Sequence, residues 1–449
     1  MEGTVIDNRF SAMVDDRPQD RVFRVDRSVY TDPDVFGAEM ERIYENGWVF
    51  LCHESQAKEP GAYFATEIGR QPVFVSRQKD GGLKGFINAC AHRGALLTPW
   101  KQGKATVLTC RFHGWSFGCD GRCIRIKNEA TGFPQKDFDR SRFDLTPVPR
   151  VESYRGFVFG SLNAEVPRIT DYLGAAAKWI DLIVEQSPGG LEVVPGSSTY
   201  TIYGNWKMQV ENAVDGYHVS TVHRVFAATV RNREERDGIS GGMGMTEGGR
   251  IAGQVPSGAY DLGNGHMSIW ATHTTPEVRP IYLQKERLEH ELPAEDVKWI
   301  LTRGRNLAVF PNVMIMDNPS TQIRVVKPVA PDRAEVTVYC IAPVGEPAAA
   351  RAARLRKFED FYLTFGMATS DDMAALEDSY EGSRARLNRW NDISNGMATM
   401  IEGPDEDAKR LGFTPASSNI DWQAETLYLG FYRRWRQMMT ASVARDDQR

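Results

Sequence analysis

The sequence predicts an α+β protein built as a small all-β domain followed by a larger domain in which helices flank an antiparallel sheet. Two observations lead to this prediction. Residues 48–163 consist of short β-rich runs separated by turn sequences such as KDGG and CDGR, which is typical of an all-β domain. After residue 163, helical stretches alternate with consecutive strands joined by short connections, which favours an antiparallel sheet with helices packed on it.

The composition is that of an ordinary globular protein, with 41% hydrophobic and 25% charged residues in a chain of 449. The formal net charge of −5 argues against a broad nucleic-acid-binding surface, which needs a basic excess. No apolar run approaches the roughly 20 residues that span a bilayer, and the N-terminus lacks the basic and apolar regions of a secretory signal. Six cysteines are too few for a disulfide scaffold. We therefore expect a cytoplasmic enzyme or a large binding protein that binds neither membrane nor nucleic acid.

The first two parts of the chain differ in their hydrophobic spacing. Residues 34–47 carry apolar side chains at helical spacing and predict a helix. The strands of the small domain are predicted where β-branched and aromatic residues cluster between turns, at 63–69, 72–78, 84–90, 105–112 and 155–162. These patterns divide the chain into an N-terminal helical segment at 1–45 that packs on the large domain, the small β domain at 46–160, and the large domain at 161–449.

The large domain opens with a predicted helix at 171–186, and a strand then leads into a polar helix within 198–223. The remaining elements are four strands, a long helical stretch and a final helix, predicted in that order at 266–275, 307–317, 321–329, 335–344, 347–382 and 423–439.

Two pairs of metal-binding side chains lie where predicted strands end in tight loops. Cys90 and His92 form the first pair, Cys110 and His113 form the second, and a glycine follows each closely. Such a set can hold one zinc ion or a Rieske [2Fe–2S] cluster, in which two thiolates bind one iron and two imidazoles the other. The cluster is favoured because a C-x-H pair is uncommon in zinc fingers and because each loop supplies one thiolate and one imidazole. Tight loops also let backbone N–H groups approach the sulfur atoms.

A second candidate metal site follows in the polar helix. His218 and His223 are five residues apart, which separates them by about 140° on an ideal helix. Binding one ion with both requires a distorted turn such as a π-bulge. Asp215 lies three residues before His218 and shares its helix face. The cluster upstream needs an electron acceptor, and an iron held by two histidines and one carboxylate would be one.

These motifs resemble those of a known family. Cys-x-His-Arg-Gly followed by Cys-x-x-His-Gly-Trp resembles the Rieske domain of bacterial ring-hydroxylating oxygenases, and Asp-x-x-His-x4-His resembles their catalytic domain. The sequence is most similar to the large (alpha) subunits of the benzoate, toluate, anthranilate and 2-halobenzoate 1,2-dioxygenase group. The resemblance covers nearly the whole chain and is carried by residues 152–163, 204–207, 265–267, 305–317, 339–343, 366–369 and 390–392.

The resemblance implies a helix-grip (Bet v1-like) catalytic domain, one Rieske [2Fe–2S] cluster and one mononuclear Fe(II) per chain. The iron ligands would be His218, His223 and a later aspartate, Asp372, with Asp371 as its nearest rival and Ser370 as the helix cap. Asp215 and Asn212 would be catalytic. Relatives suggest an assembly with a small beta subunit (α3β3) or a homotrimer, in which Asp215 bridges His218 and the His113 of a neighbouring subunit.

The implied function is that of a terminal oxygenase that inserts both atoms of O2 into an aromatic carboxylate. The product is a cis-dihydrodiol or, after loss of CO2 or an ortho substituent, a catechol. Electrons come from an NADH-dependent reductase that contains a flavin and a [2Fe–2S] cluster. One alternative is a Rieske monooxygenase that hydroxylates a substituted benzoate such as salicylate. A Rieske electron carrier and a zinc-stabilised interaction protein are alternatives of another class.

Two residues are weaker candidates for substrate binding. Arg224 directly follows His223, where the relatives usually have an aromatic residue, and its guanidinium would pair with a substrate carboxylate. The alternative is that Arg224 points to solvent or to a neighbouring subunit. His266, on a predicted strand, is the second candidate for a position facing the substrate pocket.

Overall fold

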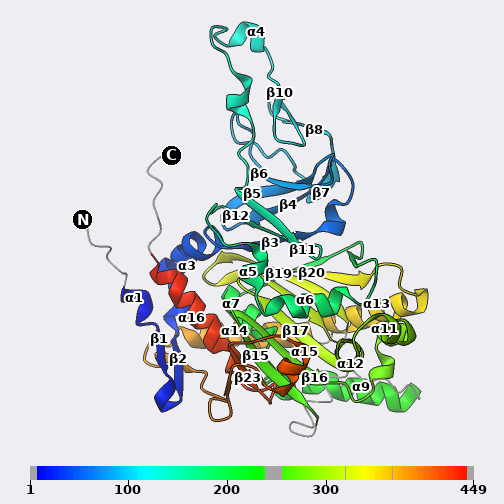
Figure 1. The fold of residues 1–449 in the computed structure, drawn as a ribbon. Helices are drawn as coiled ribbons and strands as arrows, with labels where there is room; N and C mark the ends of the chain where they lie inside the picture. The colour runs from blue at the N-terminus through cyan, green and yellow to red at the C-terminus, as the bar shows by residue number, and fades with distance from the viewer. Residues whose placement is uncertain (1–7, 238–254, 319, 367, 442–449) are drawn as a thin grey trace. The chain divides into compact units, whose positions relative to one another are not determined.

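The computed structural model describes residues 8–237, 255–318, 320–366 and 368–441 (Figure 1). The chain divides into two compact units, Tyr44–Ile169 and Met1–Ile43 together with Thr170–Arg449. The N-terminal segment therefore belongs to the larger unit, and the second boundary lies at 169 instead of the predicted 160. None of the described helices is long and apolar enough to cross a membrane.

The smaller unit is built from short antiparallel strands, and the α+β fold class is confirmed. Its sheets have the strand orders β6-β5-β4-β7, β10-β9-β8 and β11-β12-β3. The strands are β3 (Val49–His53), β4 (Ala62–Ile68), β5 (Gln71–Arg77), β6 (Leu83–Ile87), β7 (Gln102–Lys104), β8 (Val107–Thr109), β9 (Ser116–Gly118), β10 (Cys123–Arg125), β11 (Arg150–Tyr154) and β12 (Phe157–Ser161).

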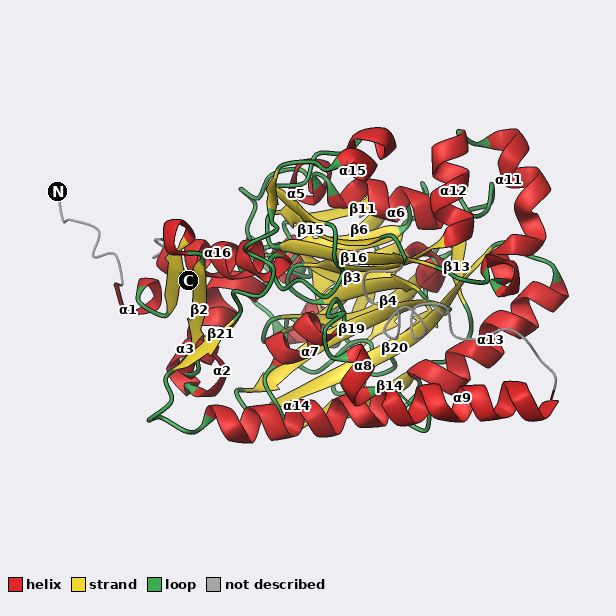
Figure 2. Cartoon of the chain, turned by 90° about the horizontal axis from the view of Figure 1, so that it is seen from below, coloured by secondary structure: helices red, strands yellow, loops and turns green. Residues whose placement is uncertain are grey.

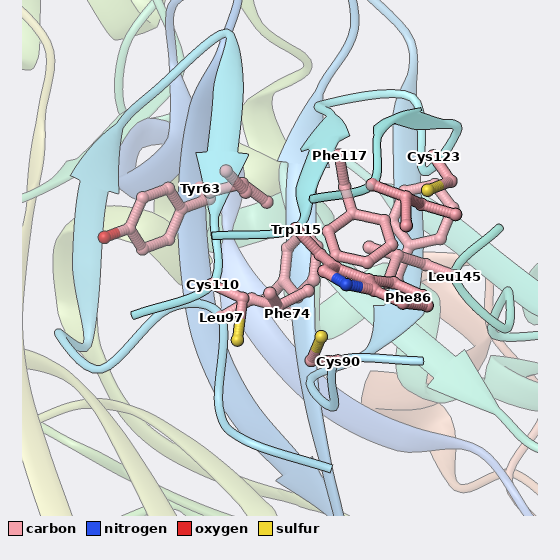
Figure 3. Packing of buried hydrophobic residues seen from close by; sticks show 12 residues of the cluster. Tyr63, Phe74, Phe86, Cys90, Leu97, Cys110, Trp115, Phe117, Cys123 and Leu145 are labelled. Carbon is pink, nitrogen blue, oxygen red and sulfur yellow. The ribbon is translucent and has the colours of Figure 1, made fainter. Parts of the chain in front are cut away.

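An aromatic cluster forms one core of this unit (Figure 3). Phe74, Phe86 and Phe117 come from three different strands, and Trp115 packs among them beside the buried Cys90 and Cys110. Figure 3 shows both cysteines at one edge of this cluster, next to Trp115. The loops that carry the predicted cluster ligands are therefore anchored on a close-packed core, which holds their geometry rigid.

The larger unit contains one broad antiparallel sheet with the order β13-β20-β19-β18-β17-β16-β15-β23-β22, and β14 also pairs with β20. Figure 2 shows its strands in yellow with helices around them. The strands are β13 (Leu191–Val193), β14 (Ser198–Ile202), β15 (Ser257–Gly263), β16 (His266–Thr272), β17 (Arg303–Val309), β18 (Val313–Asp317), β19 (Thr321–Ala330), β20 (Arg333–Pro343), β22 (Ile401–Glu402) and β23 (Ser417–Asn419).

Register places four side chains on one face of this sheet. Ile269 of β16 is paired with Asn306 of β17, which is paired with Met316 of β18. Arg324 of β19 is paired with Met314, two residues before Met316. Cross-strand partners and residues two apart point to the same face, so Ile269, Asn306, Met316 and Arg324 share one face.

Three of the sequence predictions for this unit require correction. The helix predicted at 171–186 is two helices, because Gly174 adopts a φ of +48° between them. The strand predicted at 307–317 is the end of β17 and all of β18, joined by a tight turn that contains Pro311. The helical stretch at 347–382 likewise breaks in two. The helices of the unit are α1 (Asn8–Ser11), α2 (Ser28–Thr31), α3 (Pro33–Glu39), α5 (Ile169–Leu173), α6 (Ala176–Val184), α7 (Trp206–Asn212), α8 (Val219–Val222), α9 (Arg224–Asp237), α11 (Lys285–Glu291), α12 (Ala294–Thr302), α13 (Ala348–Tyr362), α14 (Thr369–Ser383), α15 (Glu406–Leu411) and α16 (Leu427–Thr440).

A buried ion pair fastens the N-terminal segment to the rest of the larger unit. Glu39, at the end of α3, accepts hydrogen bonds from Lys207 Nζ at 2.6 Å, Trp206 Nε1 at 2.8 Å and Trp435 Nε1 at 2.6 Å. The side chains of Glu39 and Lys207 are both fully buried. Removing one partner of such a pair typically costs about 3–5 kcal/mol, because the other charge is left unpaired. The segment also supplies β1 (Val14–Arg17) and β2 (Val22–Asp26), which form a sheet with β21 (Trp390–Asp392).

Candidate active site

The two cysteine–histidine loops have the same backbone geometry. In each loop the cysteine N–H donates to the carbonyl of the fifth residue along, at 2.9 Å for Cys90 and 2.7 Å for Cys110. The fourth residue, Gly94 or Gly114, donates its N–H to the cysteine carbonyl at 2.9 Å. Both glycines have a φ above +70°, a conformation that side chains rarely adopt. The sequence therefore builds two equivalent tight loops, each presenting one thiol and one imidazole.

The four donors of these loops are arranged by kind. The rings of His92 and His113 lie 4.6 Å apart between centroids, and His92 stacks on Trp115. The two cysteines are buried, with their thiols in contact. Burial and the neighbouring Cys110 raise the pKa of the Cys90 thiol, and backbone N–H groups that donate to its sulfur oppose this rise.

This arrangement suits two irons better than one zinc ion. A tetrahedral zinc ion with bonds of about 2.0–2.3 Å holds its donors less than about 4 Å apart. Within the described part of the chain, no three of the four donors lie within 4.8 Å of one another. His113 Nδ1 is buried and has no hydrogen-bond partner. A thiol pair and a separate imidazole pair match the ligand set of a Rieske [2Fe–2S] cluster.

A very short helix brings His218 and His223 together, because the two residues flank its two ends. Helix α8 contains only Val219–Val222, with His218 directly before it and His223 directly after it. The continuous polar helix predicted from the sequence is therefore interrupted after α7, and no π-bulge is needed. Asp215 stabilises the interruption, because its Oδ1 accepts the backbone N–H of Tyr217 at 2.6 Å and of His218 at 3.2 Å.

The two histidines and Asp372 form a compact triangle of donor atoms. The His218 and His223 Nε2 atoms are 3.2 Å apart, and Asp372 Oδ1 lies 3.4 Å from the first and 3.2 Å from the second. Three donors at right angles around an ion about 2.1 Å away are about 3.0 Å apart. The triangle therefore fits one face of an octahedral ion, as in 2-His-1-carboxylate iron sites. It is the group of three possible metal ligands found among the described residues.

Asp372 reaches this site from the first turn of α14, and Asp371 is not part of the triangle. The predicted cap is wrong, because the helix begins at Thr369 after Ala368, and no side chain caps it. Asn212 donates to Asp372 Oδ1 from its Nδ2 at 3.3 Å. Asp215 Oδ2 lies 3.3 Å from His218 Nδ1, close enough for an ion pair although that nitrogen makes no well-aligned hydrogen bond.

The carboxylates set the electrostatics of the triangle. Burial lowers the pKa of His218, but Asp215 and Asp372 outweigh it and raise the pKa to about 10. Burial raises the pKa of Asp372, but the two histidines outweigh this effect and hold its pKa below the usual value. The site thus favours a cation strongly, and a metal ion that binds there must displace a proton.

A cavity of about 490 Å³, counted with its open mouth, contacts this triangle. Its walls combine apolar and aromatic side chains with amides, one carboxylate pair and one guanidinium: Asn212, Ala213, Asp215, His218, Val219, His223, Ile269, Asn306, Met316, Asn318, Arg324, Phe361, Tyr362, Asp372 and Trp422. Apolar and aromatic side chains thus lie directly beside the three metal ligands.

The two weaker candidates do not lie in this cavity. Arg224 is exposed at the first residue of α9, and it is not one of the lining residues. His266 is fully buried away from the cavity, with its Nε2 2.9 Å from the Tyr172 carbonyl and its Nδ1 accepting the Phe310 N–H. Neither position supports the substrate-binding role expected from the sequence. Arg324, which sequence reasoning did not single out, lines the cavity instead.

A buried carboxyl network lies beside Asp215. Glu211 accepts hydrogen bonds from the hydroxyls of Tyr30 and Tyr432. Burial raises the pKa of Glu211 to about 7, although Tyr432, Tyr30 and Lys207 act in the opposite direction. Between pH about 4.5 and 7 the folded protein therefore keeps a proton that the unfolded chain has lost. Stability contributed by this group falls as pH rises through that window, by about 3 kcal/mol in all.

We therefore expect Glu211→Gln to remove this pH-dependent loss, because the amide cannot ionise. The difference in melting temperature, variant minus wild type, should therefore be larger at pH 7.5 than at pH 5. Differential scanning calorimetry at both pH values measures it. Burial also raises the pKa of Glu425 to about 7. Because Glu425 is unchanged in the variant, part of the fall in stability with rising pH should remain. A melting-temperature difference that is the same at both pH values would contradict this account.

Comparisons with known proteins agree with the geometry. Residues 47–152 match the Rieske [2Fe-2S] domain, and residues 192–441 match the catalytic domain of the ring hydroxylating alpha subunit. This chain belongs to the ring-hydroxylating oxygenase alpha subunits. The resemblance inferred from the sequence is confirmed, and so are the enzyme class and the cofactors, one Rieske [2Fe–2S] cluster and one mononuclear iron.

Related alpha subunits cover nearly the full chain. Toluate 1,2-dioxygenase subunit alpha of Pseudomonas putida is 42% identical, covering 98% of this chain and 96% of its own. The 2-halobenzoate 1,2-dioxygenase large subunit of Burkholderia cepacia is 39% identical, with coverages of 96% and 93%. Among solved structures, naphthalene 1,2-dioxygenase with indole bound in the active site superposes with a TM-score of 0.79 at 26% identity, over 94% of this chain and 93% of that one.

Proposed function

We propose that this alpha subunit inserts both atoms of O2 into the ring of an aromatic carboxylate. The cavity beside the His218–His223–Asp372 triangle carries this proposal, because it sets apolar and aromatic side chains next to three metal ligands. The relatives named for toluate and 2-halobenzoate support the substrate class. We assign the iron to that triangle and the cluster to Cys90, His92, Cys110 and His113.

The metals, when bound, supply O2 activation and single-electron transfer. The side chains hold the metals, orient the ligands and line the cavity. His218, His223 and Asp372 would hold the iron, and their three donor atoms suit an ion that also binds O2. Asn212 orients Asp372 through their hydrogen bond, and Asp215 lies against His218 Nδ1 and so fixes the ring that binds the metal. Ile269, Met316 and Phe361 supply apolar walls that exclude water from the ring.

We infer that the enzyme works as an assembly, because electron transfer to the iron site needs a cluster close to it. In this proposal three alpha subunits, with or without small beta subunits (α3β3 or a homotrimer), set the cluster of one chain beside the iron of the next. Asp215 then bridges His218 and the neighbouring chain's His113. In the cytoplasm, where we place the enzyme, a separate reductase with flavin and [2Fe–2S] groups passes electrons from NADH to the cluster.

The test is turnover of benzoate and its methyl and halogen derivatives under ¹⁸O2, with the purified oxygenase, a matching reductase and NADH. We expect a cis-diol that carries two ¹⁸O atoms, and no product when the reductase is left out. A single ¹⁸O atom in the product would instead support the monooxygenase alternative. Failure to oxidise any aromatic acid, by an enzyme that contains both metals, would contradict the proposal.

A further inference from the structure

The cavity wall contains a buried positive charge that forms no ion pair with a described carboxylate, although Asp372 is near enough to act on it electrostatically. Arg324 lines the cavity and is only 3% exposed. Its Nε is buried without a hydrogen-bond partner, and none of the described carboxylates forms an ion pair with it. The ring of Tyr362 lies beside it, with the guanidinium carbon 5.9 Å from the centroid.

Other buried arginines of the same unit show what is missing. Arg279 and Arg305 both pair with Asp317, the first at 2.9 Å. Arg354 pairs with Glu346 at 3.0 Å. These guanidiniums satisfy the rule that buried charges are paired, because an isolated buried charge costs several kcal/mol. Arg303 is also buried without an ion pair to a described carboxylate, but it lies outside the cavity, whereas Arg324 departs from the rule in the cavity wall beside the metal triangle.

The metal site does not neutralise Arg324 either. Asp372 is the negative ligand of the iron triangle, and two neutral imidazoles complete it. With Fe(II) bound, that set has a net charge of about +1, and Arg324 adds another positive charge on the same cavity wall. Asp215 faces His218 Nδ1 and the backbone turn before it. The loaded cavity is therefore cationic and suits an anion.

Sheet register explains how the guanidinium and the ring-binding residues face one space. Arg324 shares a face with Ile269, Asn306 and Met316, and all four line the cavity. The Oδ1 atom of Asn306 is also buried without a partner. One wall therefore offers apolar surface for a ring and unpartnered polar atoms for a substituent.

We propose that Arg324 binds the carboxylate of the aromatic substrate and thereby selects acids over neutral rings. This inference rests on the proposed function and goes further by naming the residue that recognises the acid. A guanidinium offers two parallel N–H donors to a carboxylate, which an ammonium cannot do. The exposed Arg224 has no such role.

The experiment measures equilibrium binding to the complete oxygenase, with both metals present, without O2 or reductase. Isothermal titration gives the Kd of benzoate and of benzamide, which has nearly the same shape and no charge. The variants are Arg324→Gln and Arg324→Lys, with Arg224→Ala as the matched control. Iron and sulfide contents are counted for each protein.

In the wild type and in Arg224→Ala, we expect benzoate to bind at least tenfold more tightly than benzamide. In Arg324→Gln, the benzoate Kd should rise at least tenfold and the preference should vanish, with an intermediate value in Arg324→Lys. A purely structural arginine would lower the melting temperature when replaced. We expect unliganded Arg324→Gln to melt at the same temperature as wild type or above it, because an unpaired buried charge has been removed.

The contrary outcomes separate the two proposals. If the wild type prefers benzoate and Arg324→Gln keeps that preference, the role of Arg324 is overturned while the substrate class stands. If the wild type itself shows no preference for benzoate, both the role of Arg324 and the proposed substrate class fail. If Arg324→Gln does not fold, the test rests on Arg324→Lys. An Arg324→Lys enzyme that binds benzoate as tightly as the wild type, with the same preference over benzamide, overturns the inference.

Discussion

Replacing Asp372 by alanine is expected to abolish ring hydroxylation, by at least about a thousandfold, because the three ligands of the triangle act as one unit. Asp372 Oδ1 lies 3.2 Å from His223 Nε2 and 3.4 Å from His218 Nε2, so its loss leaves two neutral imidazoles to hold the ion. Metal analysis should show less mononuclear iron, while acid-labile sulfide and the visible spectrum of the cluster stay unchanged.

The matched control is Asp371→Ala, which removes a neighbouring carboxylate outside the triangle. This variant should keep its iron and most of its turnover. An Asp372→Ala enzyme with full iron content and wild-type rate would show that the ligand set is wrong. Loss of iron in Asp371→Ala alone would instead assign the metal to that residue.

The second large effect is expected for Asp215→Asn, which should keep both metals and lose turnover by about 10–100-fold. The amide oxygen can still accept the N–H groups of Tyr217 and His218, so the turn before α8 is preserved. The negative charge beside His218 Nδ1 is lost, and with it the carboxylate proposed to bridge two chains. Stopped-flow absorbance of the reduced cluster measures how fast it is reoxidised when substrate and O2 are added.

Asp378→Asn, an exposed change on α14, serves as the control and should reoxidise at the wild-type rate. A wild-type rate in Asp215→Asn would refute the bridging role. A normal reoxidation rate with slow product formation would also refute it, since the step affected would then lie after electron transfer.

Spacing along the chain was sufficient to propose the two cysteine–histidine pairs, whereas Asp372, 149 residues after His223, was proposed from the family resemblance. Cys90 and His92, and Cys110 and His113, lie within single tight loops, so spacing alone predicts their proximity. The spacing of His218 and His223 alone placed them about 140° apart on a helix. They were proposed as ligands because of the cluster upstream and the family motif, and the helix break that brings them together was not predicted. An interruption of six residues between α7 and α8 depends on contacts such as that of Gly216, where a Cβ would meet the Trp422 carbonyl at 2.3 Å.

Arg324 could not be predicted, because its position depends on strand register. Its distance from Asp372 in sequence is uninformative, and a shift of one residue in β19 would turn it to the other face of the sheet. The hairpin at Pro311 joins β17 to β18, the strand that pairs with β19, and it was not predicted. Arg224, by contrast, attracted attention through adjacency to His223, although neighbouring residues on a chain commonly point in different directions.

The fastening of the N-terminal segment by Glu39 has a consequence for synthesis. Trp435, a partner of Glu39, is synthesised 396 residues after it, and Tyr432 is synthesised 402 residues after its partner Tyr30. At about 5–20 residues per second, that delay lasts about 20 to 80 s. All of residues 44–169 are synthesised long before α16, so the cluster-binding unit can fold while the N-terminal segment still lacks its partners on α16. A nascent chain that stops short of α16 would therefore leave Glu39 without Trp435 and Tyr30 without Tyr432, so its N-terminal segment would be held less firmly and be more open to chaperones and proteases.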